Sequence, residues 1–362
     1  MNNNNEITIF QRQPSNIVTN QGKEGTCYAH ACSRVILNFI RWIIPNEFYP
    51  LEENDQCGNI EIITSNLESE TNIQNIFNVS ENCSEHNKNN ILLFAYIFTL
   101  VKNEFGCRGG FINYVLYWFK KSFENSLAAN FSKMEFFDTV ERKIIMTKNF
   151  FDMSTNKNLF ENFLNFNHAK YQIIENLLEK FKNEMKVKNL IISDYEKKDI
   201  EYIDINIIKY VLKQQLYIVF SKSNHSVTAI DYETVIDWSE EEDKDFIILK
   251  NSWGNTTNSK EFGTPHDKGK VIVELKSLIE KGYKDINFLL PEDNSRNVEL
   301  DEKDKQSRIR YRFSLLPFNN SQGGRCKTKK KLLKKTISKT KHRIAKKKSK
   351  TQRHFNRKNV HK

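Results

Sequence analysis

The spacing of apolar residues changes from helical in the first part of the chain to strand-like in the later part. After Cys27, apolar residues recur every three or four positions, which predicts a buried helix with Thr26 as its N-cap. The apolar run 91–101 is eleven residues long, which is too short to span a bilayer and predicts a core helix. A third helical stretch is expected over 158–186. Its apolar face comprises Phe160, Phe163, Leu164, Tyr171, Ile174, Leu177, Leu178 and Phe181.

Short runs rich in Val, Ile and aromatic residues follow in the later part. Residues 217–220, 226–232 and 246–249 predict β-strands. Helices that precede strands in this way are typical of an α+β fold. The 362 residues can bury a substantial core, either in one two-lobed domain or in two small domains.

The net charge of +11 conceals two regions of opposite character. Residues 325–362 hold 18 Lys or Arg and no acidic residue, which leaves 38 basic against 45 acidic residues in 1–324. We therefore divide the chain into a folded body, 1–320, and a Lys/Arg-rich tail, 321–362, which has too few apolar residues for a core and is expected to be disordered. The tail predicts contact with nucleic acid, nuclear import or docking on an acidic surface. A solvated tail without a fixed partner is the alternative.

Cys27 has the local sequence of a nucleophilic thiol. A thiol attacks carbonyl groups as the thiolate, which is favoured by a helix N-terminus and by a nearby histidine. Gly22 and Gly25 punctuate the loop before the predicted helix, so the sulfur is expected on its first turn. Taken alone, a cysteine at a helix start is more often structural than catalytic.

Four further residues suit a site built around this thiol. His225 opens a predicted strand, and Asn251 follows another, from which it can fix the histidine ring and tautomer. Trp253 is expected to shield that hydrogen bond from water. Gln21, six residues before Cys27, can join the Cys27 N–H in an oxyanion hole. Each segment alone also fits a packing histidine or a simple turn.

Four sequence blocks, in their chain order, resemble those of the papain-like cysteine peptidases. The resemblance implies a two-lobed fold, with the cysteine on a helical lobe and the histidine and asparagine on a β-rich lobe. It implies that Cys27 is the nucleophile, His225 the base and acid, Asn251 the residue that orients the imidazole, and Gln21 the oxyanion donor. The blocks are 20–29 (NQGKEGTCYA), 106–110 (GCRGG), 224–229 (NHSVTA) and 249–254 (LKNSWG).

The resemblance also indicates where a peptide substrate would bind. Gly109 and Gly110 resemble the backbone edge that pairs with an extended substrate, and Phe111 follows at the wall of an apolar pocket. Trp253 completes the expected substrate-binding group. An apolar residue is therefore expected just before the scissile residue of the substrate. The chemistry requires neither a metal nor a cofactor.

Several features depart from the family pattern. Glu24 replaces the cysteine that in the family bridges to the position of Cys107, so that disulfide cannot form. The other five cysteines are odd in number, and no apolar leader follows Met1. These observations predict a protein without disulfides in a reducing compartment, cytoplasm or nucleus. A zinc site from Cys57, Cys83 and His86 is a weaker alternative.

The length and composition of the chain add three expectations. The segment 47–90 is rich in Asn, Glu and Ser and is expected to be an exposed insertion, either a lid or a neutral addition. The twenty residues before Gln21 leave no room for the family's propeptide. Abundant Asn, Ile and Lys indicate an AT-rich genome. The Gly-Gly junction before the tail resembles tails in proteins of large DNA viruses, which adds a virion to the expected locations.

Three functions are compatible with these residues. The first is a cysteine endopeptidase that acts on proteins or peptides. The second is an isopeptidase or transpeptidase for ubiquitin-like substrates, which uses the same thioester. The third is an inactive peptide-binding module tethered by its basic tail.

Overall fold

The computed structural model describes residues 17–22, 25–49, 61–63, 83–106, 111–128, 134–137, 143–164, 168–198, 205–237, 242–254, 264–265 and 270–294. Within these ranges the protein has the expected α+β composition, with a seven-stranded antiparallel sheet and two two-stranded sheets. The helices are α1 (Cys27–Ile43), η1 (Pro45–Glu47), α3 (Glu85–Phe105), α4 (Ile112–Ala128), α5 (Met153–Leu164), α6 (His168–Val187), α7 (Ile205–Lys213) and α9 (Leu275–Glu280). The strands are β1 (Val18–Asn20), β2 (Glu61–Ile63), β3 (Met134–Phe137), β4 (Lys143–Met146), β5 (Leu190–Lys197), β6 (Ile218–Lys222), β7 (His225–Asp237), β8 (Glu242–Lys250), β9 (Thr264–Pro265), β10 (Lys270–Glu274) and β11 (Asp285–Asp293).

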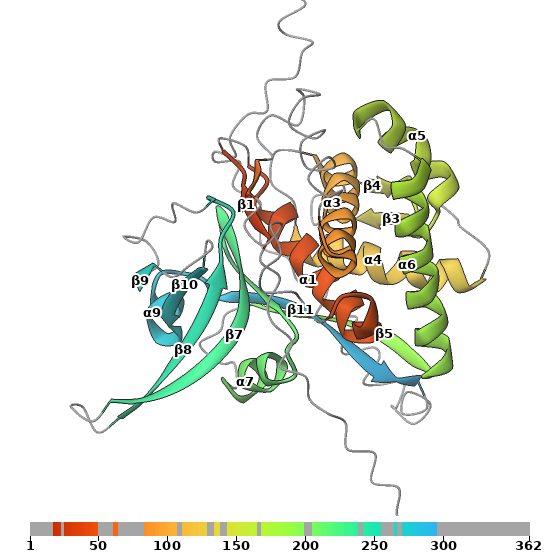
Figure 1. The fold of residues 1–362 in the computed structure, drawn as a ribbon. Helices are drawn as coiled ribbons and strands as arrows, with labels where there is room; N and C mark the ends of the chain where they lie inside the picture. Colours follow the sequence, from red (N-terminus) through yellow and green to blue (C-terminus); the bar gives the residue numbers. More distant parts are fainter. Residues whose placement is uncertain are drawn as a thin grey trace, which may run out of the picture. The chain divides into compact units, whose positions relative to one another are not determined.

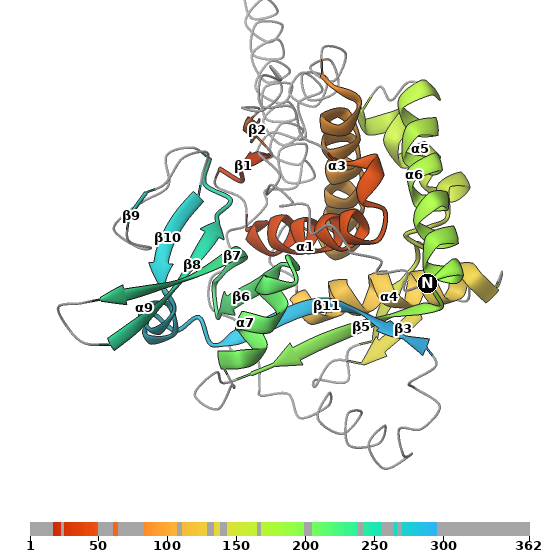
Figure 2. The same cartoon turned by 60° about the horizontal axis from the view of Figure 1, so that its bottom comes forward.

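Helix α1 is buried along almost its entire length. It contacts α3, α4 and α6 on one side and β6, β7 and β11 on the other, so it runs between helices and sheet (Figures 1 and 2). α1 is therefore an interior helix, although it also carries buried polar residues, among them Arg34 and Arg41. α1 begins at Cys27, as predicted. Thr26 occupies the N-cap position, but its side chain makes no capping hydrogen bond.

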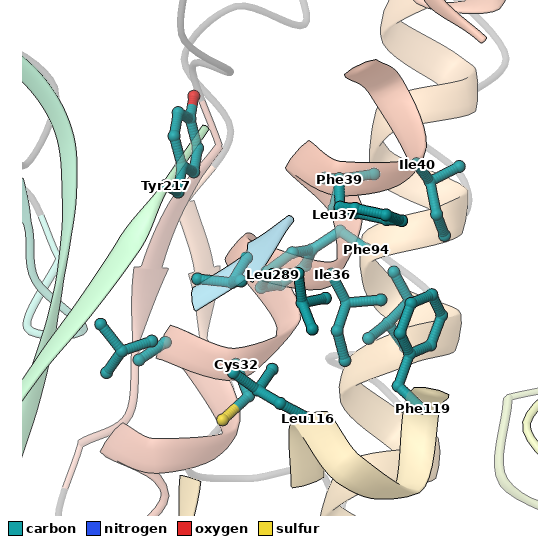
Figure 3. Packing of buried hydrophobic residues seen from close by; sticks show 14 of the residues in the cluster. Cys32, Ile36, Leu37, Phe39, Ile40, Phe94, Leu116, Phe119, Tyr217 and Leu289 are labelled. Atoms are coloured by element: carbon teal, nitrogen blue, oxygen red, sulfur yellow. The ribbon is translucent and has the colours of Figure 1, made fainter. Parts of the chain in front are cut away.

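Aromatic side chains fill the space between α1 and the surrounding helices. The Phe39 ring meets Phe119 and Phe181 edge-on at centroid distances of 6.3 and 6.1 Å, and Phe119 meets Phe150 at 4.9 Å. Phe39 and Phe119 approach each other beside α1 in Figure 3. Each such pair adds about 0.5–1.5 kcal/mol beyond the burial of its area. These contacts fix the height and rotation of the helix that carries Cys27.

The large sheet has the strand order β5-β11-β6-β7-β8-β10-β9. β6 and β7 form a hairpin in which Lys222 pairs with His225 across a two-residue turn. Thr228 of β7 pairs with Lys250 of β8, with a register shift between Ala229 and Asp231. Because the strands are antiparallel, the first residues of β7 and the residues just after β8 lie at the same end of the sheet. The three predicted strands are therefore confirmed, and each is longer than expected or shifted by a residue.

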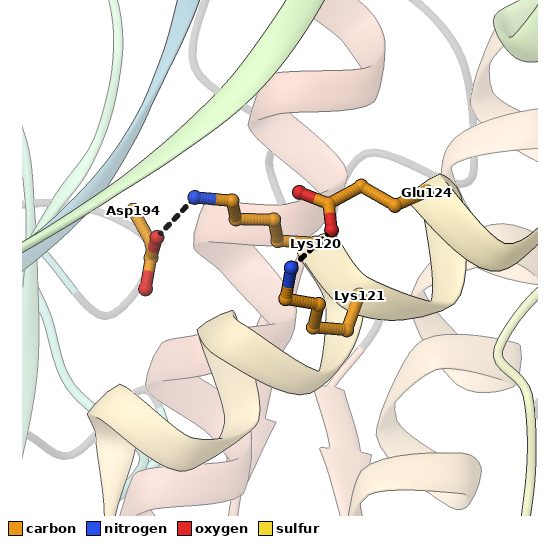
Figure 4. Close-up of polar contacts among 4 residues, drawn as sticks. All are labelled: Lys120, Lys121, Glu124 and Asp194. Atoms are coloured by element: carbon orange, nitrogen blue, oxygen red, sulfur yellow. Dashed lines mark hydrogen bonds and ion pairs between the residues drawn. The ribbon is translucent and has the colours of Figure 1, made fainter. Parts of the chain in front are cut away.

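A salt bridge links a helix to the edge strand of this sheet. The Lys120 Nζ of α4 lies 3.0 Å from the Asp194 carboxylate of β5 (Figure 4). Lys121, one residue later, turns instead to Glu124 of its own helix. Both side chains of the first pair are largely covered, so it is less screened than a fully exposed ion pair.

One expectation about helices was wrong in its bounds. The single helical stretch predicted over 158–186 is two helices, α5 and α6, and α5 begins earlier, at Met153. The apolar face was correct for the residues whose burial is described: Phe160, Tyr171, Ile174, Leu177, Leu178 and Phe181. The core helix predicted over 91–101 is confirmed as the centre of α3.

The segment 47–90 is not uniformly an exposed insertion. Its last residues form the first turns of α3, where Asn89 and Asn90 are buried. Asn89 Nδ2 donates to the Glu47 carbonyl at 2.8 Å, which ties the two ends of the segment together. In addition, β2 pairs in parallel with β1, the strand that precedes Gln21. Polar composition misled the prediction because buried asparagines can satisfy backbone groups.

The expectation of a protein without disulfides was also wrong. Cys83 is disulfide-bonded, and its partner lies outside the described residues. The bridge removes the cysteine argument for a reducing compartment, and it occupies the thiol that the zinc alternative required. Among the described residues no group of three or more His, Cys, Asp or Glu is placed to hold a metal. No helix in the described ranges is long and apolar enough to cross a membrane.

Candidate active site

Cys27 is the first residue of α1, and 9% of its surface is exposed. Burial raises the pKa of its thiol, whereas hydrogen bonds from the main chain of Ser226, Tyr28 and Cys27, and from the Ser226 hydroxyl, act in the opposite direction. The expected helix-start N–H groups are therefore present, but they do not outweigh the loss of solvation. A thiolate at this position needs a further positive charge.

The Ser226 contact brings the start of β7 to the Cys27 thiol. Ser226 directly follows His225, so His225 is one residue along the chain from a residue that contacts the thiol. The hairpin register explains the arrangement, because His225 stands at the first position after the β6–β7 turn. Sequence reasoning missed Ser226, although its place beside His225 was a usable signal.

His225 is held by the two residues expected to hold it. Its Nε2 lies 3.0 Å from Asn251 Oδ1, and its ring stacks on Trp253 with 4.7 Å between centroids. Asn251 Oδ1 also accepts a hydrogen bond from the Ser252 N–H at 2.7 Å, which identifies this atom as the acceptor. Nε2 therefore carries the proton, and Nδ1 is left to accept one. All of this lies at low exposure, where hydrogen bonds are strong.

Gln21 is joined to the same turn. Its N–H donates to the Ser252 carbonyl at 2.7 Å, and its Oε1 accepts from the Ser252 hydroxyl. Because Oε1 is the acceptor in that pair, Nε2 is the donor end of the amide. Gln21 is buried, with 8% exposed. Ser252 was not foreseen as the residue that orients this amide.

The candidate substrate-binding residues are only partly within the described ranges. Phe111 is 43% exposed and packs edge-on against Tyr114 at 5.2 Å. Gly109 and Gly110 lie outside the described residues, as does Cys107. The Tyr28 hydroxyl donates to the carbonyl of Gly106, the first residue of the block 106–110. The residue after Cys27 therefore anchors the chain three residues before Gly109.

His30, one turn after Cys27, takes no part in this constellation. It is fully buried, and its ring lies 4.5 Å from that of Phe98. Burial, followed by the nearby charges of Arg34 and Lys102, holds the pKa of His30 well below its usual value. It is a neutral packing residue.

Comparisons with known sequences assign this site no chemistry. No model of a known protein family matches the chain, and no curated protein matches it significantly. A function for this protein therefore has to be argued from its own residues and their geometry.

Proposed function

We propose that this protein is a cysteine-type peptidase with a papain-like two-lobed architecture and that Cys27 is its nucleophile. One observation carries the proposal: the imidazole of His225 is fixed between Asn251 and Trp253 with Nε2 protonated, while the adjoining Ser226 contacts the Cys27 thiol. The α+β fold and the place of Cys27 on a helix packed against the sheet support the same reading.

The reaction follows from the assigned protonation states. His225 Nδ1 takes the Cys27 proton, and the sulfur attacks the substrate carbonyl to form a C–S bond. The resulting oxyanion accepts hydrogen bonds from Gln21 Nε2 and the Cys27 N–H. The imidazolium then protonates the leaving amine as the C–N bond breaks. Water, deprotonated by His225, hydrolyses the thioester, releases a carboxylic acid and restores the thiol.

Burial of the thiol sets a condition on this mechanism. Burial raises the pKa of the Cys27 thiol. The thiolate is therefore formed by transfer of the proton to the His225 imidazole rather than by release of the proton to water. The imidazolium supplies the positive charge that the backbone N–H groups alone do not. Removal of His225 should consequently abolish thiol reactivity at neutral pH.

A pair of cysteine variants tests the proposal. Cys27 and Cys32 both lie on α1, and Cys32 is completely buried in the core. Cys27→Ala should reduce hydrolysis of a peptide library to background and abolish labelling by a thiol-directed epoxide. Cys32→Ala should retain both. Unchanged turnover in Cys27→Ala would refute the proposal, and a folded wild-type protein that binds peptides without cleaving them would favour an inactive module.

The thioester chemistry also serves isopeptidases and transpeptidases. A ubiquitin vinyl sulfone probe separates these possibilities, since only an enzyme that recognises the ubiquitin-like fold should react with it faster than with a short peptide vinyl sulfone. We propose peptide hydrolysis as the primary activity because Phe111 offers an exposed apolar side chain beside the glycine block. Equal reactivity with both probes would agree with it.

A further inference from the structure

Arg34 is a buried cation on the same face of α1 as Cys27. The two residues are seven positions apart, which is close to two full helical turns. Only 6% of Arg34 is exposed. Its guanidinium lies between α1, which carries Cys27, and the segments that carry Gln21 and Asn251.

The hydrogen bonds of Arg34 join these three segments. Its Nη2 donates to Thr19 Oγ1 in β1, two residues before Gln21. The same nitrogen donates to the main-chain carbonyl of Asn251 at 3.1 Å. The main-chain carbonyl of Asn251 is thus bound to Arg34, while its side-chain Oδ1 is bound to the His225 imidazole.

Other bonds make β1 and the Asn251 turn a single unit. Gly254 N–H donates to the Thr19 carbonyl at 2.9 Å, and Lys250 Nζ donates to the Ile17 carbonyl at 3.0 Å. Asn20 forms an antiparallel bridge with Trp253. Arg34 connects this unit to α1 through its bonds to Thr19 and Asn251.

Burial of the charged Arg34 guanidinium is energetically unfavourable. Burial lowers the pKa of Arg34 to about 10, so it is still charged at neutral pH. It forms no ion pair with any described carboxylate, and its Nε has no hydrogen-bond partner there. A buried, unpaired charge costs stability that an apolar side chain of similar volume would not. The cost indicates a role other than packing.

We propose that Arg34 is a positioning residue that sets Asn251, and through it the His225 ring, relative to the Cys27 thiol. This inference rests on the proposed function for its kinetic consequence, but its structural part concerns only the His225–Asn251 hydrogen bond. Arg34 does not touch the reacting atoms. Its effect should therefore appear in the rate of the chemical step rather than in substrate binding.

Arg41 provides a matched control. It lies seven residues further along α1, is 1% exposed and lines the same small cavity as Arg34. Its guanidinium is bound instead to Tyr49, with its Cζ 4.7 Å from the Tyr49 ring centroid. Arg34→Met and Arg41→Met make the same chemical change in the same helix, and each removes a buried charge. Arg34→Lys restores the charge with a shorter side chain.

Kinetics and melting temperature form the first arm of the test. Arg34→Met should lower kcat on the order of 10²-fold, the scale of a misplaced catalytic group, with KM within about threefold, an assumption based on the absence of substrate contact. Arg34→Lys should recover part of the loss. Arg41→Met should leave kcat near the wild-type value whatever its melting temperature. Equal kcat losses in the two Met variants, or no loss in Arg34→Met, would overturn the proposal.

The second arm does not require activity. In protein labelled with ¹⁵N-histidine, the Nε2–H signal of His225 is assigned by its loss in His225→Gln. This signal should be lost or shifted in Arg34→Met and retained in Arg41→Met. If the wild-type protein neither cleaves peptides nor labels at Cys27, the proposed function fails, and this signal still decides the role of Arg34. A signal unchanged in Arg34→Met would refute the positioning role.

Discussion

At the scale of single residues, the burial of neutral His30 should make the stability of the fold decrease at acidic pH. His30 is neutral in the folded protein because burial holds its pKa well below the usual value of about 6.5. In the unfolded chain it binds a proton below that value, so the stabilisation present above pH 6.5 is lost as the pH falls toward the folded pKa. His30→Phe keeps the ring that packs on Phe98 and should remove this loss.

The melting temperature of both proteins is measured between pH 7 and 5. It should fall more steeply with pH in the wild-type protein, because protonation of His30 lowers the free energy of unfolding by up to about 1.4 kcal/mol per pH unit. Equal slopes for the two proteins would show that folding does not lower the pKa of His30. His168→Phe, an exposed substitution of the same kind at the start of α6, is the control for the loss of a histidine.

Gln21 supports a second prediction at this scale. Loss of its amide removes one oxyanion donor, so Gln21→Ala should lower kcat about 10²-fold while peptide binding changes little. Ser252→Ala should have a smaller effect of the same kind, because it frees the Gln21 amide to rotate. Gln172→Ala, on the exposed face of α6, serves as the control. A Gln21→Ala enzyme with unchanged kcat would exclude the residue from the mechanism.

Asn251 gives a graded expectation. Its side chain orients the imidazole but takes no part in proton transfer, so Asn251→Ala should keep measurable activity, unlike His225→Ala. Rates of Cys27 alkylation as a function of pH test this. Asn251→Ala should retain a reactive thiol at neutral pH, whereas His225→Ala should react only as the pH rises toward the elevated thiol pKa. Identical profiles for the two variants would contradict the assigned roles.

At the scale of elements, the disulfide of Cys83 lies just before α3, whose N-terminus is capped by Ser84. α3 packs on α1, so a constraint at its start stabilises the helix that carries the nucleophile. Reductant should lower the wild-type stability by about 2–4 kcal/mol. The Cys83→Ser protein should start from the lower value and ignore reductant. A wild-type melting curve that is the same with and without reductant would show that the bridge does not contribute.

At the scale of the whole molecule, charge separates a mildly acidic body from the basic residues 325–362, which lie outside the described ranges. Deletion of 325–362 should leave peptide turnover within about twofold, an expectation that assumes no contact with the site. Binding to nucleic acid should be lost and, in the full chain, should weaken steeply with salt through counterion release. Salt-insensitive binding, or binding that survives the deletion, would assign the partner to the body.

The sequence alone determined those features that depend on local periodicity and on residue type. Apolar spacing was enough to place the start of α1 at Cys27, the core of α3, and strands β6, β7 and β8, because these elements are buried on faces that repeat every 3.6 or two residues. The proposal of Cys27, His225 and Asn251 as site residues came from their local blocks. Their contacts required the hairpin register that brings the start of β7 and the end of β8 to one end of the sheet.

Tertiary structure alone decided what depends on contacts between distant segments. The break between α5 and α6, the burial of Asn89 and the disulfide of Cys83 carry no periodic signal. Nor does the raised pKa of the Cys27 thiol, since desolvation depends on everything packed around it. Arg34 is the clearest case, because in the sequence it is one basic residue in a helix. Its bonds to Thr19 and Asn251 exist only when segments 15 and 217 residues away along the chain meet beneath the same helix.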